Sequence, residues 1–98
     1  MDKIPPFRLR NPNQLVKQIG QRIRAHRKGR GWTQAELAER SGISLSTLKL
    51  MEREGKGSLQ RLAKVAVILN LDGELRELFA ATPAYATLDD VEATHRSR

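Results

Sequence analysis

The sequence predicts an all-α domain of five helices, and three observations carry that prediction. Apolar residues recur at three- and four-residue spacing through most of residues 11–80. A side chain suited to capping precedes each predicted helix, and glycine or asparagine follows most of the predicted helix ends. A chain of 98 residues has room for one small domain, so we divide it into an N-terminal arm (1–10), the helical domain (11–80) and a C-terminal tail (81–98).

The first predicted helix runs from residue 12 to about residue 28. Asn11 is a suitable N-terminal cap, Pro12 fits the first helical position, and Gln14 stands three residues after the cap. Gly29-Arg30-Gly31 ends the helix. The residues expected to form its apolar stripe are Leu15, Val16, Ile19 and Ile23.

The second and third helices are predicted to form a closely connected pair. Thr33 and Glu36 make a capping box, which starts the second helix at residue 34. Gly42 ends it, because glycine adopts the left-handed conformation at almost no cost. Ser44 caps a third helix over residues 45–53. The residues expected to face inward are Leu37, Ala38, Ile43, Leu48 and Met51. Two helices joined by so short a turn are the signature of a helix-turn-helix.

Two further helices are predicted after the connector at residues 54–57. Ser58 caps a helix over residues 59–69, and Asn70 suits the left-handed position that ends it. Asp72 is expected to cap a short fifth helix that extends to about Ala80. The residues expected to face the core are Leu59, Leu62, Val65, Ala66, Leu69, Leu71 and Leu75.

Charge is distributed unevenly along the chain, whose formal net charge is +7. Residues 1–56 contain thirteen Lys and Arg against five Asp and Glu, whereas residues 57–98 contain five against six. The basic half therefore holds the connected helix pair. A polyanionic partner explains this asymmetry better than a generally basic surface does.

The residue types that catalysis and metal binding require are scarce. The sequence has no cysteine, His26 and His95 lie far apart, and the serines fall at caps and turns. We therefore predict no enzymatic activity, no cofactor and no metal site. The first ten residues do not resemble a signal peptide, and the longest apolar run, residues 65–69, is too short to cross a bilayer. A cytoplasmic location is expected.

The segment Thr-Gln-Ala-Glu-Leu-Ala-Glu-Arg-Ser-Gly-Ile-Ser, residues 33–44, resembles the DNA-binding domains of the lambda-repressor/Cro (Xre) family. Six positions match the pattern of that family, namely Gln34, Ala38, Gly42, Leu48, Met51 and Glu52. The resemblance implies a lambda-repressor-like helix-turn-helix fold, a nucleoid-associated protein, and double-stranded operator DNA as its partner.

The third helix is expected to read DNA bases, because the second helix of a helix-turn-helix lies in the major groove. Once Leu48 and Met51 are assigned to the core, the outward residues are Leu45, Ser46, Lys49 and Leu50. Ser46 and Lys49 offer hydrogen bonds, and the leucines offer apolar contact with thymine methyl groups. Leu50 is equally compatible with an ordinary apolar surface position. Family members often carry a polar residue where Leu45 stands, so the bases that family members recognise cannot be assigned to this sequence.

The resemblance also implies residues that position the protein on DNA. Gln34 corresponds to a phosphate contact at the start of the second helix, where free backbone amides favour an anion. Further candidates for phosphate binding are Arg30, Thr33, Ser44, Thr47 and Lys56. Arg27 matches the family's first-helix arginine that pairs with a glutamate at the end of the recognition helix, here Glu52. One more phosphate contact is the alternative role for Arg27.

A narrower resemblance covers about residues 11–71. Asn-Pro-Asn-Gln-Leu, residues 11–15, and Gly-Trp-Thr-Gln, residues 31–34, resemble HipB-type antitoxins. Such proteins repress their own operon and bind a kinase-like HipA toxin. The sequence thus leaves two functions open: an autoregulating repressor that is also an antitoxin, and a stand-alone regulator of phage or restriction-modification type.

The ends of the helical domain suggest contacts between proteins. Leu78 and Phe79 exceed what so small a core needs, so they are predicted to lie in a homodimer interface. The N-terminal arm contains Pro5-Pro6 and is expected to be extended. A strand at the dimer interface, a basic arm in a DNA groove, and a disordered segment are all compatible with it.

The C-terminal tail combines acidic and apolar residues. Tyr85, Leu88 and Val91 would share one face of a helical turn, although a flexible tail is equally compatible. We expect this tail to contact a toxin or another subunit.

Overall fold

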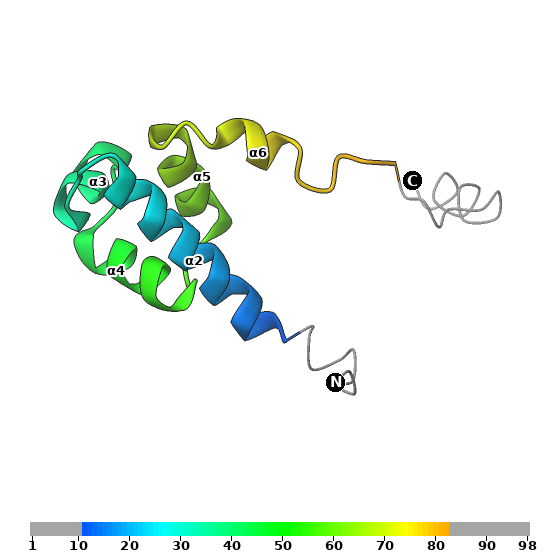
Figure 1. The fold of residues 1–98 in the computed structure, drawn as a ribbon, viewed down its shortest axis with the longest axis horizontal. Coiled ribbons are helices and arrows are strands. Elements are labelled where there is room, and N and C mark those ends of the chain that lie inside the picture. Colours follow the sequence, from blue (N-terminus) through cyan, green and yellow to red (C-terminus); the bar gives the residue numbers. More distant parts are fainter. Residues whose placement is uncertain (1–10, 83–98) are drawn as a thin grey trace.

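The computed structural model describes residues 11–82 and consists of helices over that range (Figure 1). Its five helices are α2 (Pro12–Gly29), α3 (Gln34–Ser41), α4 (Leu45–Glu54), α5 (Leu59–Ile68) and α6 (Asp72–Arg76). The all-α prediction is confirmed, and the described range contains no strand. The predictions for the N-terminal arm and for residues 83–98 of the tail concern residues outside this range.

The predicted caps account for where the first four helices begin. Asn11 Oδ1 accepts hydrogen bonds from the backbone amides of Asn13 and Gln14. Thr33 and Glu36 form the reciprocal capping box, with Glu36 N to Thr33 Oγ1 at 3.1 Å and Thr33 N to Glu36 Oε1 at 2.7 Å. The hydroxyls of Ser44 and Ser58 cap α4 and α5 in the same way. These bonds satisfy amides that a helix leaves free at its start.

The predicted start and end of the last helix were wrong. Leu71, rather than Asp72, occupies the N-terminal cap position, and no side chain caps the helix. The amide of Leu71 instead closes the end of α5 by donating to the Ala66 carbonyl oxygen at 2.7 Å, after Asn70 has turned the chain with φ 61°. The helix ends at Arg76 instead of Ala80, because residues 77–80 form tighter turns.

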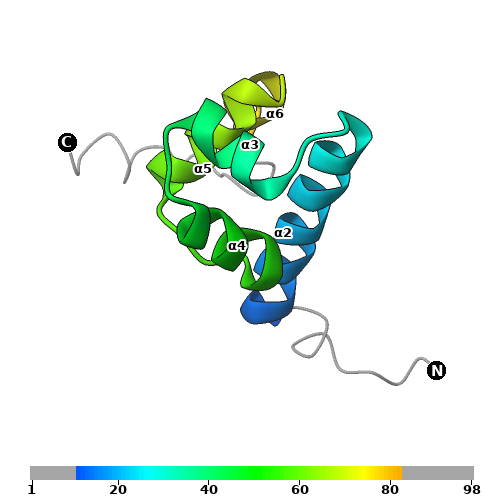
Figure 2. The same ribbon diagram turned by 90° about the vertical axis from the view of Figure 1, so that its left-hand side faces the viewer.

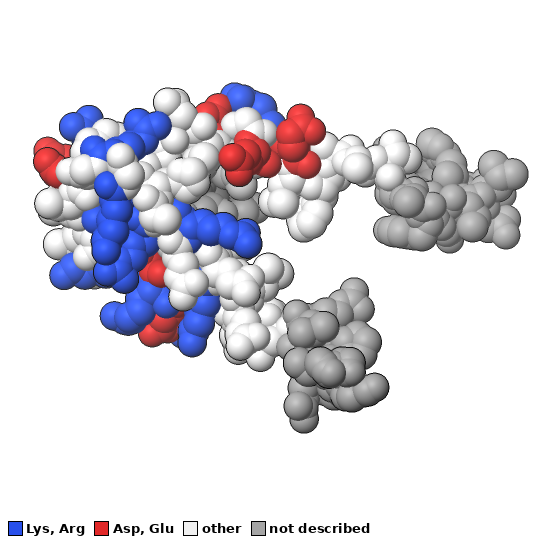
Figure 3. All heavy atoms as spheres, in the orientation of Figure 1, with Lys and Arg blue, Asp and Glu red and all other residues white. Residues whose placement is uncertain are grey.

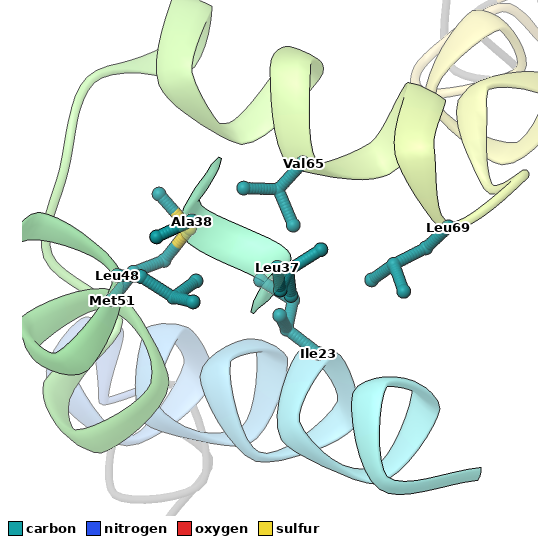
Figure 4. Close-up of a cluster of buried hydrophobic side chains, with 7 residues drawn as sticks. All are labelled: Ile23, Leu37, Ala38, Leu48, Met51, Val65 and Leu69. Carbon is teal, nitrogen blue, oxygen red and sulfur yellow. The ribbon is translucent and has the colours of Figure 1, made fainter. Parts of the chain in front are cut away.

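The core lies between α2, α3, α4 and α5. Figure 4 shows Leu37 of α3 near its centre, with Val65 on one side and Ile23 on the other. The buried cluster consists of Ile23, Leu37, Ala38, Leu48, Met51, Val65 and Leu69. Leu37, Leu48 and Val65 are almost fully inaccessible to solvent. Burying each of these side chains stabilises the fold by about 1.5–3 kcal/mol.

Two leucines that were expected to face the core do not reach it. Leu15 is 55% exposed and Leu59 is 73% exposed. Leu15 lies in the first turn of α2, and Leu59 is the first residue of α5. Both are therefore at the edge of the bundle, where the neighbouring helices do not cover them. The inward prediction for these two residues was wrong.

Two glycines bring α2 and α4 into close contact, an arrangement visible in Figures 1 and 2. A Cβ atom at Gly20 would stand 2.9 Å from the Glu52 carbonyl oxygen and closer still to that of Met51. At the end of α4, Gly55 has φ 70° and lies against the backbone of Val16. Any larger side chain at either position would push the helices apart. The glycines therefore help to fix how α4 sits on the rest of the domain.

Candidate nucleic-acid interface

Three residues, Gly42 to Ser44, separate α3 from α4. Gly42 adopts φ 72° and ψ 31°, and the following amide, that of Ile43, donates to the Ala38 carbonyl oxygen at 3.0 Å. The left-handed glycine thus ends α3 and turns the chain within one residue. Ser44 then starts α4 at once. This is the compact helix–turn–helix that the sequence predicts, and it presents α4 on the surface (Figure 2).

The residues predicted to read bases lie on α4 with different exposures. Ser46 and Lys49 are exposed, and Leu45 is 38% exposed. Leu50 is half-buried, so less of its side chain is available for contact than an outward position would give. The first turn of α4 therefore presents Leu45 and Ser46, and its second turn presents Lys49.

Two predicted phosphate contacts, Thr33 and Ser44, also serve as helix caps, and a third, Thr47, is hydrogen-bonded to Ser44. Thr33 Oγ1 accepts from an amide of α3, and Ser44 Oγ accepts from Thr47 N at 3.1 Å. Ser44 Oγ donates to Thr47 Oγ1 at 2.6 Å. Thr33 and Ser44 are exposed and Thr47 is half-buried, so all three hydroxyls lie at or near the surface beside the helix starts.

Two other predicted phosphate contacts are engaged elsewhere. Arg30 Nη2 donates to the Leu69 carbonyl oxygen at 3.0 Å, which ties the start of the α2–α3 connection to the end of α5. Its guanidinium carbon also lies 5.3 Å from the centre of the Trp32 ring. Lys56 lies 3.3 Å from a carboxylate oxygen of Glu54. Neither residue lines the hollow that contains Gln34 and Lys49.

A buried ion pair joins α2 to α4. Arg27 Nε donates to Glu52 Oε2 at 2.8 Å, and Arg27 Nη2 donates to Glu52 Oε1 at 3.1 Å. The exposed fractions of the two residues are 7% and 3%. Arg27 Nη1 donates to the Trp32 carbonyl oxygen at 2.8 Å. The two-pronged geometry fixes the angle of both side chains, and it is the pairing that the family resemblance implied.

Gln34 joins this ion pair at the start of α3. Its Nε2 donates to Glu52 Oε1 at 3.0 Å, so one carboxylate oxygen receives both Arg27 and Gln34. A side-chain amide has two N–H groups, and Glu52 occupies one of them. We name Arg27, Gln34 and Glu52 the buried network. It connects α2, α3 and α4 through side chains alone.

A basic hollow of about 480 Å³ opens next to the buried network. Its lining residues are Gln21, Arg24, Arg27, Gln34, Lys49, Glu52 and Arg53. Arg24 and Lys49 form no ion pair with any residue in the range 11–82. Because Glu52 is committed to Arg27, the hollow presents mainly positive charge and amide groups. Such a surface suits an anion.

Comparison with known proteins identifies the family. A family model described as a helix-turn-helix domain matches residues 18–79. The chain belongs to this helix-turn-helix family. It is 42% identical over 55 residues to the HTH-type transcriptional regulator SinR of Bacillus subtilis (strain 168), an alignment that covers 54% of this chain and 50% of that protein. SinR of Bacillus licheniformis matches with the same figures. The chain spans about half the length of the curated relatives it matches.

Three residues of the basic hollow in this helix-turn-helix domain were not singled out from the sequence. They are Gln21, Arg24 and Arg53. Helical spacing contained a signal for them: Gln21 and Arg24 precede Arg27 at intervals of three, and Arg53 follows Lys49 by four.

Arg53 also contacts a carboxylate at the end of α4, because its Nε lies 3.2 Å from Glu54 Oε2. Hydrogen bonds from Lys56 and Arg53 hold the pKa of the Glu54 carboxyl below its ordinary value, so that carboxylate stays charged.

Basic side chains outnumber acidic ones over much of the face drawn in Figure 3. Most of the Lys and Arg side chains in this view lie over the part of the molecule that holds α2, α3 and α4, with fewer acidic side chains among them, and several acidic side chains lie at α6. In the part of the chain that the structure describes, no cluster of His, Asp and Glu is arranged to hold a metal ion. No helix between residues 11 and 82 has the length and apolar character needed to span a membrane.

Proposed function

We propose that this protein is a sequence-specific DNA-binding transcription regulator that places α4 in the major groove. The observation that carries the proposal is the exposed face of α4 next to the basic hollow, with the buried network holding α4 on α2 and α3. Membership of the helix-turn-helix family supports it, and two relatives are described as transcriptional regulators.

Base reading is assigned to the exposed side of α4. Ser46 and Lys49 supply hydrogen-bonding groups, and Leu45 supplies apolar contact with a thymine methyl. Leu50 adds a smaller apolar contact from its half-buried position. Lysine reaches guanine acceptors or a phosphate with equal ease, so Lys49 links base reading to the basic hollow.

Phosphate binding is assigned to the start of α3 and to the basic hollow. The second N–H of Gln34 is directed by the bond that the first makes to Glu52, and the free backbone amides of α3 favour an anion at the same place. Arg24 and Arg53 add charge from the two sides of the hollow. Thr33, Ser44 and Thr47 add hydroxyl groups at the helix starts.

We further propose that the protein binds a palindrome as a homodimer. Leu78 is 51% exposed and Phe79 is 92% exposed, and apolar side chains this accessible are more costly on a monomer than in an interface. Helix-turn-helix dimers bind half-sites about 34 Å apart, one helical turn of DNA, so the operator is expected to have that spacing.

The finer proposal is an autoregulating repressor that also acts as a HipB-like antitoxin toward a HipA-like kinase toxin. It is supported by the resemblance of residues 11–15 and 31–34 to that class. A stand-alone regulator without a toxin is the second candidate, and the description of the curated relatives as transcriptional regulators favours it. A kinase-like gene beside this one, whose product co-purifies with the protein, would decide for the antitoxin. A neighbourhood without such a gene would decide for the regulator.

Fluorescence anisotropy tests DNA binding directly. The probe is duplex DNA from immediately upstream of the gene, with a shuffled duplex of equal length as the reference. Affinity for the upstream DNA should be higher and should fall with salt, at a log–log slope of about −0.9 for each phosphate neutralised. Lys49→Ala should reduce the preference for the upstream DNA. Lys64→Ala is the matched control. Lys64 is exposed, belongs to α5 and not to α4, and does not line the basic hollow. Equal affinity for the two duplexes would refute the proposal.

A further inference from the structure

An apolar groove lies between α2 and α5, on residues that the proposed DNA contacts do not use. Two adjoining hollows of about 350 and 280 Å³ form it, and both are lined by Ile19, Ile23, Leu62 and Leu78. Leu59 lines the larger hollow and is 73% exposed. Apolar surface left open in this way is costly in water and indicates a place where another apolar group packs.

Phe79, the residue after Leu78, is unfavourable where it stands in two respects. The Ala80 amide donates to the Glu77 carbonyl oxygen at 3.1 Å and closes a turn whose third residue is Phe79, with φ 59°. A positive φ at that position normally belongs to glycine or asparagine and is an outlier for a bulky side chain. The Phe79 side chain is also 92% exposed and lines neither hollow. Strain combined with an exposed aromatic ring indicates a residue that is held ready for binding.

The chain thus carries both halves of a self-complementary contact. Leu78 lines the groove and Phe79 projects beside it, so an apolar recess and an apolar projection are neighbours on one surface. A two-fold interface brings the same patch of two copies together, and each projection then faces the recess of the other copy. A second copy of this chain is therefore the occupant that the surface fits.

The charges near these two parts are complementary. Arg22 lines the groove from α2, and Glu77 is exposed two residues before Phe79. Neither forms an ion pair with a residue between positions 11 and 82. Lys56 also lines the groove, but it is already paired with Glu54. Glu74 lines the groove from α6, so Glu77 of an inserted copy is expected on the opposite side, near Arg22. Exposed charges of this kind orient an interface more than they strengthen it.

We propose that two copies of this protein pair by exchanging Phe79, each phenyl ring inserting into the groove between α2 and α5 of the other copy. This inference rests on the proposed homodimer and names the residue that anchors it. The groove begins with the residues that directly follow α4, whereas Leu45 and Ser46 stand at the start of that helix. The base-reading residues of both copies therefore stay open.

The anchor accounts for only part of a stable interface. A phenylalanine buries about 150–250 Å², whereas a standard interface buries about 800 Å² on each partner. The free dimer is therefore expected to dissociate reversibly on dilution. An operator with two half-sites would hold two copies side by side and favour the exchange.

Phe79→Asn in the full-length chain gives two effects of opposite direction. Asparagine tolerates a positive φ, so the melting temperature of the dilute monomer should stay the same or rise. The dimer dissociation constant, measured by analytical ultracentrifugation, should increase about tenfold or more because the anchor is lost. Val67→Ala is the control, since Val67 is 55% exposed on α5 and lines neither hollow; it should leave the dissociation constant unchanged. An unchanged dissociation constant for Phe79→Asn would overturn the proposal.

Cross-linking locates the contact, because the natural sequence has no cysteine. An Ala80→Cys chain is mixed with a Leu59→Cys chain and treated with a short bismaleimide. Both positions are exposed, and Phe79 is kept in both chains. The product that joins the two different chains, identified by mass spectrometry, should form in several-fold higher yield than with Val67→Cys in place of Leu59→Cys.

The outcomes separate this inference from the proposed homodimer. A protein that dimerises while the Leu59 and Val67 yields are equal pairs through another surface, which overturns the exchange of Phe79 and leaves the homodimer intact. A protein that stays monomeric at every concentration, both free and on the upstream DNA, overturns both.

Discussion

Gln34 and Arg27 share a single oxygen of Glu52: Gln34 Nε2 lies 3.0 Å and Arg27 Nη2 lies 3.1 Å from Glu52 Oε1. The glutamine at the start of α3 is therefore held by the same carboxylate that locks α4 to α2. This relationship gives Gln34 two roles, one in stability and one in the proposed contact with phosphate. Its orientation is set before any DNA arrives, which avoids an ordering cost on binding.

Gln34→Ala should therefore change both properties. Losing a hydrogen bond to a charged group should lower the free energy of unfolding by about 1.5–3 kcal/mol, measured by urea denaturation. Affinity for upstream and shuffled DNA should fall by the same factor, because a phosphate contact carries no sequence information. A change in the ratio of the two affinities would instead make Gln34 a base-reading residue.

Removing Arg27 should be far more costly than removing an exposed arginine. Arg27→Met leaves Glu52 charged and buried without its partner, which should cost about 3–5 kcal/mol in unfolding free energy. Replacing both residues, with Arg27→Met and Glu52→Leu, should recover much of that loss. Arg53→Met is the control: its pair with Glu54 is exposed to solvent, so its loss should cost far less than the loss of Arg27. Equal losses for Arg27→Met and Arg53→Met would contradict the burial of the ion pair.

Gly20→Ala should destabilise the domain, although alanine favours helices. A Cβ at this position meets the backbone carbonyl oxygens of Met51 and Glu52, which cannot move without shifting α4. Overpacking of this kind should cost about 1–3 kcal/mol. In the same helix, Gly29→Ala meets no atom within 4 Å and should be neutral or stabilising by up to about 1 kcal/mol. Thermal melts of the two variants should shift in opposite directions or differ by several degrees.

Two serines three residues apart should respond differently to alanine. Ser41 is buried and its hydroxyl has no hydrogen-bond partner among the described residues, so Ser41→Ala should leave stability unchanged or raise it by up to about 1 kcal/mol. Ser44 caps α4, so Ser44→Ala should cost about 1 kcal/mol. Urea denaturation of both variants measures the difference. A destabilised Ser41→Ala protein would reveal a hydrogen bond that the structure does not contain.

Local chemistry explains why much of the fold could be predicted. Capping residues such as Thr33 and Ser44, and the left-handed Gly42, act within four residues of their own position, so the sequence alone reveals them. The predicted core positions of α3 and α4 are also buried or half-buried, because helical spacing places them on one face.

The remaining features depend on contacts between helices. Gly20 has no local signature, and only the approach of α4 shows why no side chain fits there. Leu15 and Leu59 follow the apolar pattern and yet lie beyond the edge of the core. Asp72 is a suitable capping residue, but the N-terminal cap position of α6 is taken by Leu71, whose amide closes the end of α5. Asp72 is therefore the first residue of the helix and not its cap. The members of the basic hollow come from three helices, so no single stretch of sequence reveals it.

The position of Trp32 makes the joint between α2 and α3 optically observable. It is the single tryptophan of the chain, its carbonyl oxygen accepts the Arg27 guanidinium, and Arg40 lies 4.3 Å from the centre of its ring. Its intrinsic fluorescence therefore reports on one defined place: the loop that joins the buried network to the start of α3. A shift in its emission on mixing with DNA would report a change in that loop without an attached dye. A shift during denaturation would report the stage of unfolding at which the ion pair is lost.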